Sequence, residues 1–265
     1  MKLSISNIAW DSSRDMEVYK LMGKYGFTGL EIAPTRFFSQ DPYAHMEEAV
    51  KLTKSLKDTY GFEVCSMQSI LFGRTEKIFE SQENQQKISD YLIKAIDFAA
   101  AISCGNLVFG SPKNRSISSE EDYNSAVNFF TLLGDYALKN GTVMSIEANL
   151  CIYGTNFINY THEAVKLVKE VNSEGFKVNL DFGTIIENEE NIDEIVDDLE
   201  YINHIHISEP GLLPISLREG HKKLSHMLKE RLYEGYVSIE MKKNGDQSLL
   251  HIENAMSYVA EVFGT

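Results

Sequence analysis

The sequence has few cysteines, few prolines and no long apolar run, and each shortage excludes a class of protein. Only three of its 265 residues are cysteine and none form a CxxC pair, so we expect a reducing compartment and no disulfide framework. Five prolines and 17 glycines exclude collagen-like and proline-rich architectures. No stretch approaches the roughly 18 apolar residues of a membrane span, and the N-terminus lacks the apolar segment of a signal peptide. The expectation is a cytoplasmic protein without a membrane partner.

Basic residues are also scarce relative to acidic ones. The sequence has 25 lysines and arginines against 39 aspartates and glutamates, a formal net charge of −14. Such a chain repels polyphosphate at long range, which argues against a nucleic-acid partner. The remaining composition, 43% apolar and 24% charged, is that of an ordinary globular protein.

Short β-rich segments alternate with helical patterns along the whole chain. The β-rich segments predict strands over 3–9, 29–33, 62–68, 106–110, 143–149, 177–181, 204–208 and 236–241. The patterns between them predict helices over 15–24, 43–60, 84–102, 120–139, 161–171, 191–199, 221–233 and 246–263. Eight such units without a linker predict a single (β/α)8 barrel over residues 1–265. An open doubly wound sheet is the alternative, but the first turn lacks the glycine-rich motif of that fold.

The last four predicted strands carry polar residues on one face, although parallel strands covered by helices are normally apolar. The alternating polar residues are Ser145, Glu147, Asn149, Asn179, Asp181, His204, His206, Ser208, Ser238 and Glu240. A period of two places each set on a single face of its strand. We therefore expect these side chains to point into the barrel, near the carboxyl-terminal end where barrel active sites are built.

Four of these residues form a candidate metal site. Glu147, Asp181, His206 and Glu240 come one from each of four successive strands. Three carboxylates at one barrel mouth, beside an imidazole, would repel one another unless a cation lay between them. Oxygen-rich ligation with one histidine favours a single Mn²⁺ ion, with Mg²⁺, Co²⁺ or Zn²⁺ as alternatives. The competing explanation is a set of hydrogen-bonded core groups or half-exposed strands.

Five motifs follow one another along the chain: GFTGLEIAP, VMSIEANL, KVNLDFG, HIHISEP and YVSIEM. In their order and spacing the chain resembles the xylose-isomerase-like barrels, which include sugar phosphate isomerases/epimerases, ketohexose 3-epimerases and hydroxypyruvate isomerase. The resemblance implies a (β/α)8 fold with one metal ion held by Glu147, Asp181, His206 and Glu240. It also implies that Glu147 and Glu240 act as an acid/base pair in epimerisation.

Three positions depart from the ketohexose 3-epimerases. Those enzymes tend to carry glutamate six residues after the first metal glutamate, histidine three residues after the metal aspartate and arginine six residues after the metal histidine. This chain has Tyr153, Thr184 and Leu212 at these positions. A free ketohexose therefore fits the pattern poorly as the substrate.

The function expected from these residues is that of a metal-dependent sugar isomerase or epimerase. A divalent ion can hold two adjacent oxygens of a hydroxy-ketone and stabilise the enediolate formed when the proton leaves, while two glutamates remove and return that proton. A lyase of the inosose-dehydratase type and a non-catalytic sugar-binding barrel that keeps the metal site are the alternatives. A phosphodiesterase like the AP endonucleases is disfavoured by the acidic charge and by the small number of histidines, seven in all.

Further contacts to the sugar are expected from the loops that follow the strands. The candidate substrate-binding residues are Trp10, Gln68, Lys113, Arg115 and Glu209. Trp10 would either stack on a sugar face or pack in the core. Gln68 would hydrogen-bond either a sugar hydroxyl or a polar group of the core. Glu209 would support the metal ligands or the substrate, or would be an exposed loop carboxylate.

Cations and aromatic residues also gather in these loops. The cations are Arg36, Arg74, Lys77, Lys113, Arg115, Lys242 and Lys243. They predict a phosphorylated or acidic sugar, unless they are incidental solvated residues. Phe37, Phe38 and Phe72 predict an apolar lid, a homo-oligomer contact or ordinary packing.

Overall fold

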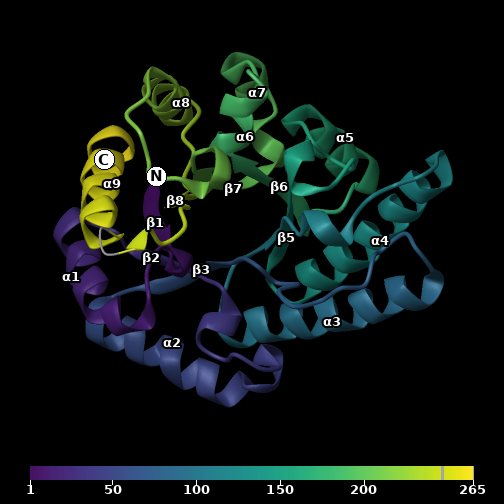
Figure 1. The fold of residues 1–265 in the computed structure, drawn as a ribbon, viewed down its shortest axis with the longest axis horizontal. Coiled ribbons are helices and arrows are strands. Elements are labelled where there is room, and N and C mark those ends of the chain that lie inside the picture. The colour runs from purple at the N-terminus through teal and green to yellow at the C-terminus, as the bar shows by residue number, and fades with distance from the viewer. Residues whose placement is uncertain (246–247, 265) are drawn as a thin grey trace.

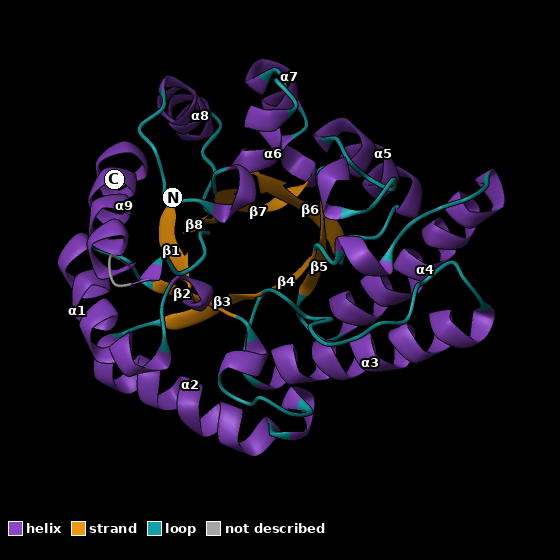
Figure 2. Ribbon diagram, viewed as in Figure 1, coloured by secondary structure: helices purple, strands orange, loops and turns teal. Residues whose placement is uncertain are grey.

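Eight parallel strands close into a barrel in the computed structural model, which describes residues 1–245 and 248–264 (Figures 1 and 2). The strands are β1 Lys2–Ser6, β2 Gly29–Ile32, β3 Glu63–Met67, β4 Asn106–Phe109, β5 Val143–Glu147, β6 Phe176–Asp181, β7 Ile202–Ile207 and β8 Tyr236–Ile239. They pair in sequence order, and β1 pairs with β8 to complete the ring. Every predicted strand overlaps one of these, so the predicted (β/α)8 barrel is confirmed.

Helices surround the ring of strands, as Figure 2 shows in purple around orange. They are α1 Asp15–Tyr25, α2 Met46–Tyr60, α3 Gln82–Ala101, α4 Glu120–Lys139, α5 Thr161–Val171, α6 Phe182–Glu187, α7 Ile192–Asp197, α8 Glu219–Glu230 and α9 Ser248–Phe263. In the ranges that the structure describes, no helix is long and apolar enough to cross a membrane. The first two residues of the helix predicted over 246–263 lie outside the described residues.

One predicted helix needs correction, and one helix was missed. The helix predicted over 43–60 begins at Met46, because Pro42–Ala44 forms a separate 3-10 turn. The short helix α6 was not predicted at all. It begins directly after β6, where the Asp181 carboxylate accepts a hydrogen bond of 2.7 Å from the backbone N–H of Thr184 and so caps the new helix.

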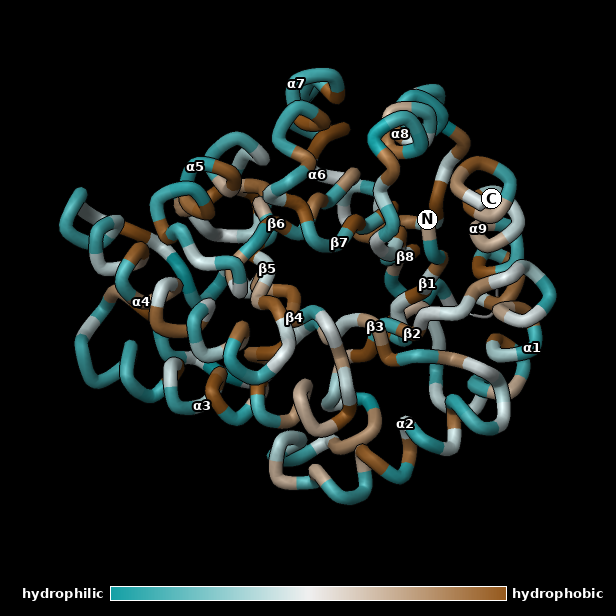
Figure 3. The backbone as a smooth tube through the Cα atoms, turned by 180° about the vertical axis from the view of Figure 1, so that it is seen from behind, coloured by the Kyte–Doolittle hydropathy of each residue, from teal (hydrophilic) through white to brown (hydrophobic). Residues whose placement is uncertain are grey.

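Aliphatic side chains fill the layer between the strands and the helices. Ile146, Ile205 and Ile239 alternate with the polar residues of their strands and are fully buried in the hydrophobic core. Burying each such side chain contributes roughly 1.5–3 kcal/mol. The outer helices carry both teal and brown segments in Figure 3, as amphipathic helices do. The remaining faces of these strands are therefore free to carry polar groups into the barrel.

The strand register brings the polar groups of neighbouring strands to one level. Asp181 of β6 lies beside His206 of β7, and Glu147 of β5 lies beside Asn179 of β6. Glu240 follows the last residue of β8, and its backbone N–H still donates to the carbonyl of Ile207, over 3.0 Å. These residues meet at the carboxyl-terminal end of the barrel.

Candidate metal centre

The structure brings together the four side chains that the sequence singled out as metal ligands. One ligand atom from each of Glu147, Asp181, His206 and Glu240 lies within 4.8 Å of the others. His206 Nδ1 stands 3.1 Å from Glu147 Oε1 and 3.3 Å from Glu240 Oε2. The cluster has the composition and the spacing to hold one divalent cation.

The electrostatics of the cluster are those of a site with excess negative charge. Burial, followed by repulsion from the Glu147 carboxylate, raises the pKa of Asp181 to about 6. Burial raises the pKa of Glu240 to about 7, against the opposing effect of His206. Although burial opposes it, the carboxylates of Glu31 and Glu240 hold the pKa of His206 well above its usual value. The cluster therefore favours bound protons or a bound cation, and its donor set fits a divalent ion.

The Glu147 carboxylate is held from two sides. Asn179 Nδ2 donates to Oε1 over 2.7 Å, and Asn149 Nδ2 donates to Oε2 over 2.8 Å. Gly110, the residue after β4, leaves the room for this carboxylate, because a Cβ there would stand 2.9 Å from Oε2. The orientation of Glu147 is thus fixed by its neighbours.

Arg115 lies behind this arrangement rather than in the open mouth. Its guanidinium is fully buried, and Nη2 donates to the Glu147 carbonyl over 2.6 Å and to Asn149 Oδ1 over 2.8 Å. Burial lowers its pKa to about 9. The second of these bonds turns the Asn149 amide so that its nitrogen faces Glu147. Arg115 is placed to support the site, and a direct contact with substrate stays a prediction.

A pocket of about 400 Å³ opens beside the cluster. Glu147, Asp181 and Glu240 form part of its lining. The three positions that depart from the ketohexose 3-epimerases also line it, together with one lysine: Tyr153, Thr184, Leu212 and Lys242. The substitutions noticed in the sequence therefore lie where a substrate bound beside the cluster would touch them.

Glu209 is the predicted substrate-binding residue that lines this pocket. Its carboxylate accepts a hydrogen bond of 2.8 Å from Arg218 Nε and one of 3.1 Å from the backbone N–H of Ser216. Its charge is therefore balanced by Arg218. Lys113 is exposed on the turn after β4, next to Pro112 of the pocket wall.

Trp10 and Gln68 are buried and bonded to protein groups. The Trp10 side chain is 2% exposed, and its indole Nε1 donates to Asp15 Oδ1 over 2.7 Å. Gln68 Nε2 donates to Ser6 Oγ over 2.7 Å and to Glu31 Oε1 over 3.0 Å. Neither belongs to the described lining of the pocket, and their contacts with a sugar stay predictions.

Three of the seven cations of the strand-to-helix loops have carboxylate partners. Arg36 pairs with Asp15 at 2.5 Å, Lys243 pairs with Asp11 at 2.7 Å, and Arg74 pairs with Glu76. Lys242 is the loop cation that reaches the pocket lining. The mouth is therefore less cationic than the sequence indicated.

The aromatic residues of these loops differ in exposure. Phe37 and Phe38 pack against the hydrophobic core, whereas Phe72 is 68% exposed. Their proposed part in a lid or in a homo-oligomer contact stays a prediction.

Glu31 of β2 is a site residue that sequence reasoning missed. It is fully buried, and its Oε2 lies 3.0 Å from His206 Nε2 and 3.0 Å from His204 Nε2. The signal was present, since Glu31 is a charge between the aliphatic residues Leu30 and Ile32 of a parallel strand. It lacks, however, the alternation of polar residues that marked the other four positions.

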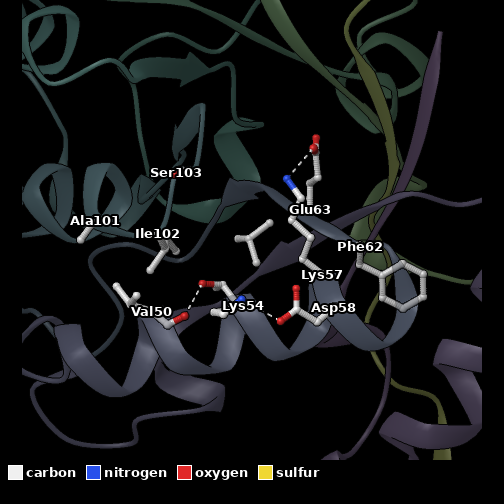
Figure 4. A pocket seen from close by; sticks show the side chains of 11 residues that line it. Val50, Lys54, Lys57, Asp58, Phe62, Glu63, Ala101, Ile102 and Ser103 are labelled. Atoms are coloured by element: carbon white, nitrogen blue, oxygen red, sulfur yellow. Dashed lines mark hydrogen bonds and ion pairs between the residues drawn. The ribbon is translucent and has the colours of Figure 1, made fainter.

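A second concavity lies at the opposite end of the barrel. It measures about 350 Å³ and lies between α2 and the start of β3 (Figure 4). Its charged side chains pair with one another, Lys54 with Asp58 at 2.8 Å and Lys57 with Glu63 at 3.5 Å. Because barrel enzymes build their sites at the carboxyl-terminal ends of the strands, this groove is not the candidate active site.

Comparison with solved structures shows the same fold in several sugar epimerases. The 3-keto-D-glucoside 4-epimerase from E. coli has a TM-score of 0.79 and 18% sequence identity, over 98% of this chain and 99% of that one. The D-psicose 3-epimerase from Clostridium cellulolyticum H10, solved with D-tagatose, has a TM-score of 0.80 and 15% identity over 100% of both chains. The IolI protein, solved with a bound zinc atom, has a TM-score of 0.75 and 15% identity, over 99% of this chain and 98% of that one.

Sequence comparison identifies the family. A search of curated protein sequences found no match. The family described as xylose isomerase-like TIM barrel matches residues 20–261, nearly the whole chain. This range contains all four residues of the candidate metal centre as well as Glu31. The closed parallel barrel agrees with that match. This chain therefore belongs to the xylose isomerase-like TIM barrel family.

Proposed function

We propose that the protein is a metal-dependent isomerase or epimerase of a sugar or sugar derivative. The observation that carries the proposal is the four-residue cluster, whose ligand atoms lie within 4.8 Å of one another beside a pocket of about 400 Å³. The sugar epimerases that share the fold support the reaction class. Mn²⁺ is the proposed ion, because the cluster offers three carboxylates and one imidazole.

Each residue of the cluster has a proposed role. A divalent ion held by the four side chains would polarise two adjacent oxygens of the substrate and stabilise the enediolate formed on deprotonation. Asp181 and His206 act only as ligands. Glu147 and Glu240 reach the pocket from β5 and from the end of β8, and each has a second carboxylate oxygen that can face the substrate. One of them removes the proton and the other returns it.

The substrate is a sugar derivative rather than a free ketohexose. Tyr153, Thr184 and Leu212 line the pocket where ketohexose 3-epimerases carry ionisable or strongly polar groups. The Tyr153 hydroxyl already accepts a hydrogen bond of 3.0 Å from the backbone N–H of Gly211. Lys242 supplies one cation to the lining, which suits an acidic or phosphorylated group on the sugar.

Deuterium exchange tests the proposal directly. The protein reconstituted with Mn²⁺ is incubated in deuterated water with a panel of ketoses, ketose phosphates and keto-acid sugars, and NMR follows both product formation and deuterium incorporation. We expect turnover of at least one substrate, lost on chelation. The variants Glu147→Gln and Glu240→Gln should lose far more turnover than Mn²⁺ binding, and one of them should retain proton exchange without net conversion.

The matched control is Glu121→Gln, an exposed carboxylate on the first turn of α4. It should keep full activity. Loss of a β-hydroxyl group from the substrate would instead identify the lyase alternative. Sugar binding without exchange or conversion, across the whole panel and with Mn²⁺ bound, would contradict the enzyme and favour a binding protein.

A further inference from the structure

A chain of hydrogen bonds crosses the barrel beneath the candidate metal centre. Glu31 of β2 accepts on both oxygens: Oε2 lies 3.0 Å from His206 Nε2, and Oε1 accepts from Gln68 Nε2 over 3.0 Å. Gln68 Nε2 also donates to Ser6 Oγ, over 2.7 Å. All four residues are at most 5% exposed. The chain therefore links β1, β2 and the residue after β3 to the histidine of the cluster.

The two nitrogens of the His206 ring face different surroundings. Nε2 faces the Glu31 carboxylate, whereas Nδ1 faces Glu147 Oε1 at 3.1 Å and Glu240 Oε2 at 3.3 Å. An ionised carboxylate can only accept, so Nε2 must carry a proton to bond with it. A neutral ring that keeps its proton on Nε2 has its lone pair on Nδ1, on the side of the other ligands.

We propose that Glu31 and Gln68 are a positioning pair that fixes the Nε2–H tautomer of His206 and so presents Nδ1 to the divalent ion. This inference rests on the metal site of the proposed function. Neither residue belongs to the described lining of the pocket, so the pair acts through His206 and not on the substrate. It also gives Gln68 a different role from the sugar contact expected from the sequence.

For the pair to work, both side-chain oxygens of residue 31 must accept hydrogen bonds. A glutamine at this position has one oxygen and one NH₂ group. If its NH₂ group faced Gln68, two donors would oppose each other, and relieving them would require the Gln68 amide to turn over and give up its present bonds to Ser6 Oγ and Ser69 Oγ. If it faced His206, Nε2 would have to accept, and the ring proton would move to Nδ1, where it blocks the metal. Each orientation of the amide therefore breaks one link of the chain.

The same reasoning predicts a rescue by exchange of the two residues. In the double variant E31Q/Q68E the amide oxygen at position 31 faces the His206 Nε2–H, and its NH₂ group donates to the new carboxylate at position 68. The Ser6 hydroxyl, which now accepts from Gln68, can rotate and donate to that carboxylate. The order of donors and acceptors is then restored, and the negative charge lies at position 68 instead of position 31.

Metal binding by full-length protein tests the inference without any substrate. Mn²⁺ affinity is measured by electron paramagnetic resonance titration and the ligand field by the visible spectrum of the Co²⁺ form. We expect E31Q to bind Mn²⁺ about 10–100-fold more weakly, the range for loss of a group that orients a metal ligand, with an altered Co²⁺ spectrum. E31Q/Q68E should recover most of the affinity and the wild-type spectrum. Thermal unfolding of the metal-free proteins separates this from a general loss of stability.

The tautomer itself is read from the Zn²⁺-loaded wild-type protein labelled with [¹⁵N]histidine. We expect His206 to show a protonated Nε2 and a metal-bound Nδ1, and this measurement holds even if E31Q fails to fold. A metal-bound or unprotonated Nε2 overturns the inference, as does E31Q with wild-type Mn²⁺ affinity and Co²⁺ spectrum. A double variant no better than E31Q also overturns it. Failure of the wild-type protein to bind any divalent ion removes the proposed function as well, which distinguishes the two failures.

Discussion

Gly110→Ala is a small change that tests the position of the Glu147 carboxylate. A Cβ at Gly110 would stand 2.9 Å from Glu147 Oε2, and ordinary contact begins at 3.4 Å, so the two atoms must separate by 3.4 − 2.9 = 0.5 Å. Metal–ligand distances vary by only about 0.2 Å in well-formed sites. The carboxylate therefore has to leave the position that its two asparagine partners define. We expect Mn²⁺ affinity to fall about 10–100-fold, as when the support of a ligand is removed.

The fold should tolerate the same substitution. Gly110 is not among the glycines with positive φ in the described chain, so alanine needs no strained backbone there. The free energy of unfolding of the metal-free protein should change by no more than about 1 kcal/mol. Gly105→Ala is the matched control, because Gly105 precedes the same strand at its other end and a Cβ there meets nothing within 4 Å.

Isothermal titration with Mn²⁺, combined with thermal unfolding of both variants, provides the assay. Weak binding by Gly110→Ala with normal binding by Gly105→Ala supports the described position of Glu147. Equal Mn²⁺ affinity in the wild-type protein and both variants would refute the reasoning, because the Glu147 carboxylate would then have more space around it than the structure shows.

Three further predictions follow from the charges of the site. Asp181→Ala should abolish stoichiometric Mn²⁺ uptake in elemental analysis, and retained uptake would remove Asp181 from the ligand set. The raised pKa values of Asp181, about 6, and Glu240, about 7, make the folded metal-free protein bind more protons than the unfolded chain. These two groups therefore stabilise the fold at pH 4, and that stability, on the order of a few kcal/mol, is lost as pH rises to about 8. The melting temperature with and without Mn²⁺ should diverge over that range, and parallel curves would contradict the assignment. Lys242→Met should weaken binding of acidic or phosphorylated sugars by roughly 1.5–3 kcal/mol and leave neutral sugars unchanged, as measured by competition assays at low and high salt.

The alternation of polar residues was enough to predict the barrel interior at the last four strands. Glu147, Asp181 and His206 each lie in a run where polar and aliphatic residues alternate, and a strand covered by helices can place such a polar face only inside the barrel. The same rule applies to Glu31, but the residues two positions away are Gly29 and Ala33, and a single charge does not reveal a period. The lack of a second polar residue in this strand therefore limited what the pattern could show.

The loops were less predictable, because their contacts join segments far apart in the sequence. Arg36 bonds Asp15, 21 residues away, and Arg115 bonds the Glu147 carbonyl, 32 residues away. The sequence shows that a cation is present, but its hydrogen-bond partner depends on how the loops pack against one another. The short helix α6 was missed for a similar reason, since the Asp181 carboxylate that caps it was assigned to the metal site alone.

Burial raises the free energy of the ionised carboxylates when no cation is bound, and it also strengthens their attraction to a cation. Glu31, Glu147 and Glu240 are each at most 8% exposed, so little water stabilises their charge. Two cationic side chains lie against them: His206 between all three, and Arg115 behind Glu147. A divalent ion adds two charges at the point where the ligand atoms converge, and it replaces protons that the carboxylates would otherwise bind. Because the unfolded chain has no such convergence, the ion binds the folded state alone, and the free energy of binding adds to the free energy of unfolding. The fold and the metal site should consequently lose stability together when the ion is removed above neutral pH.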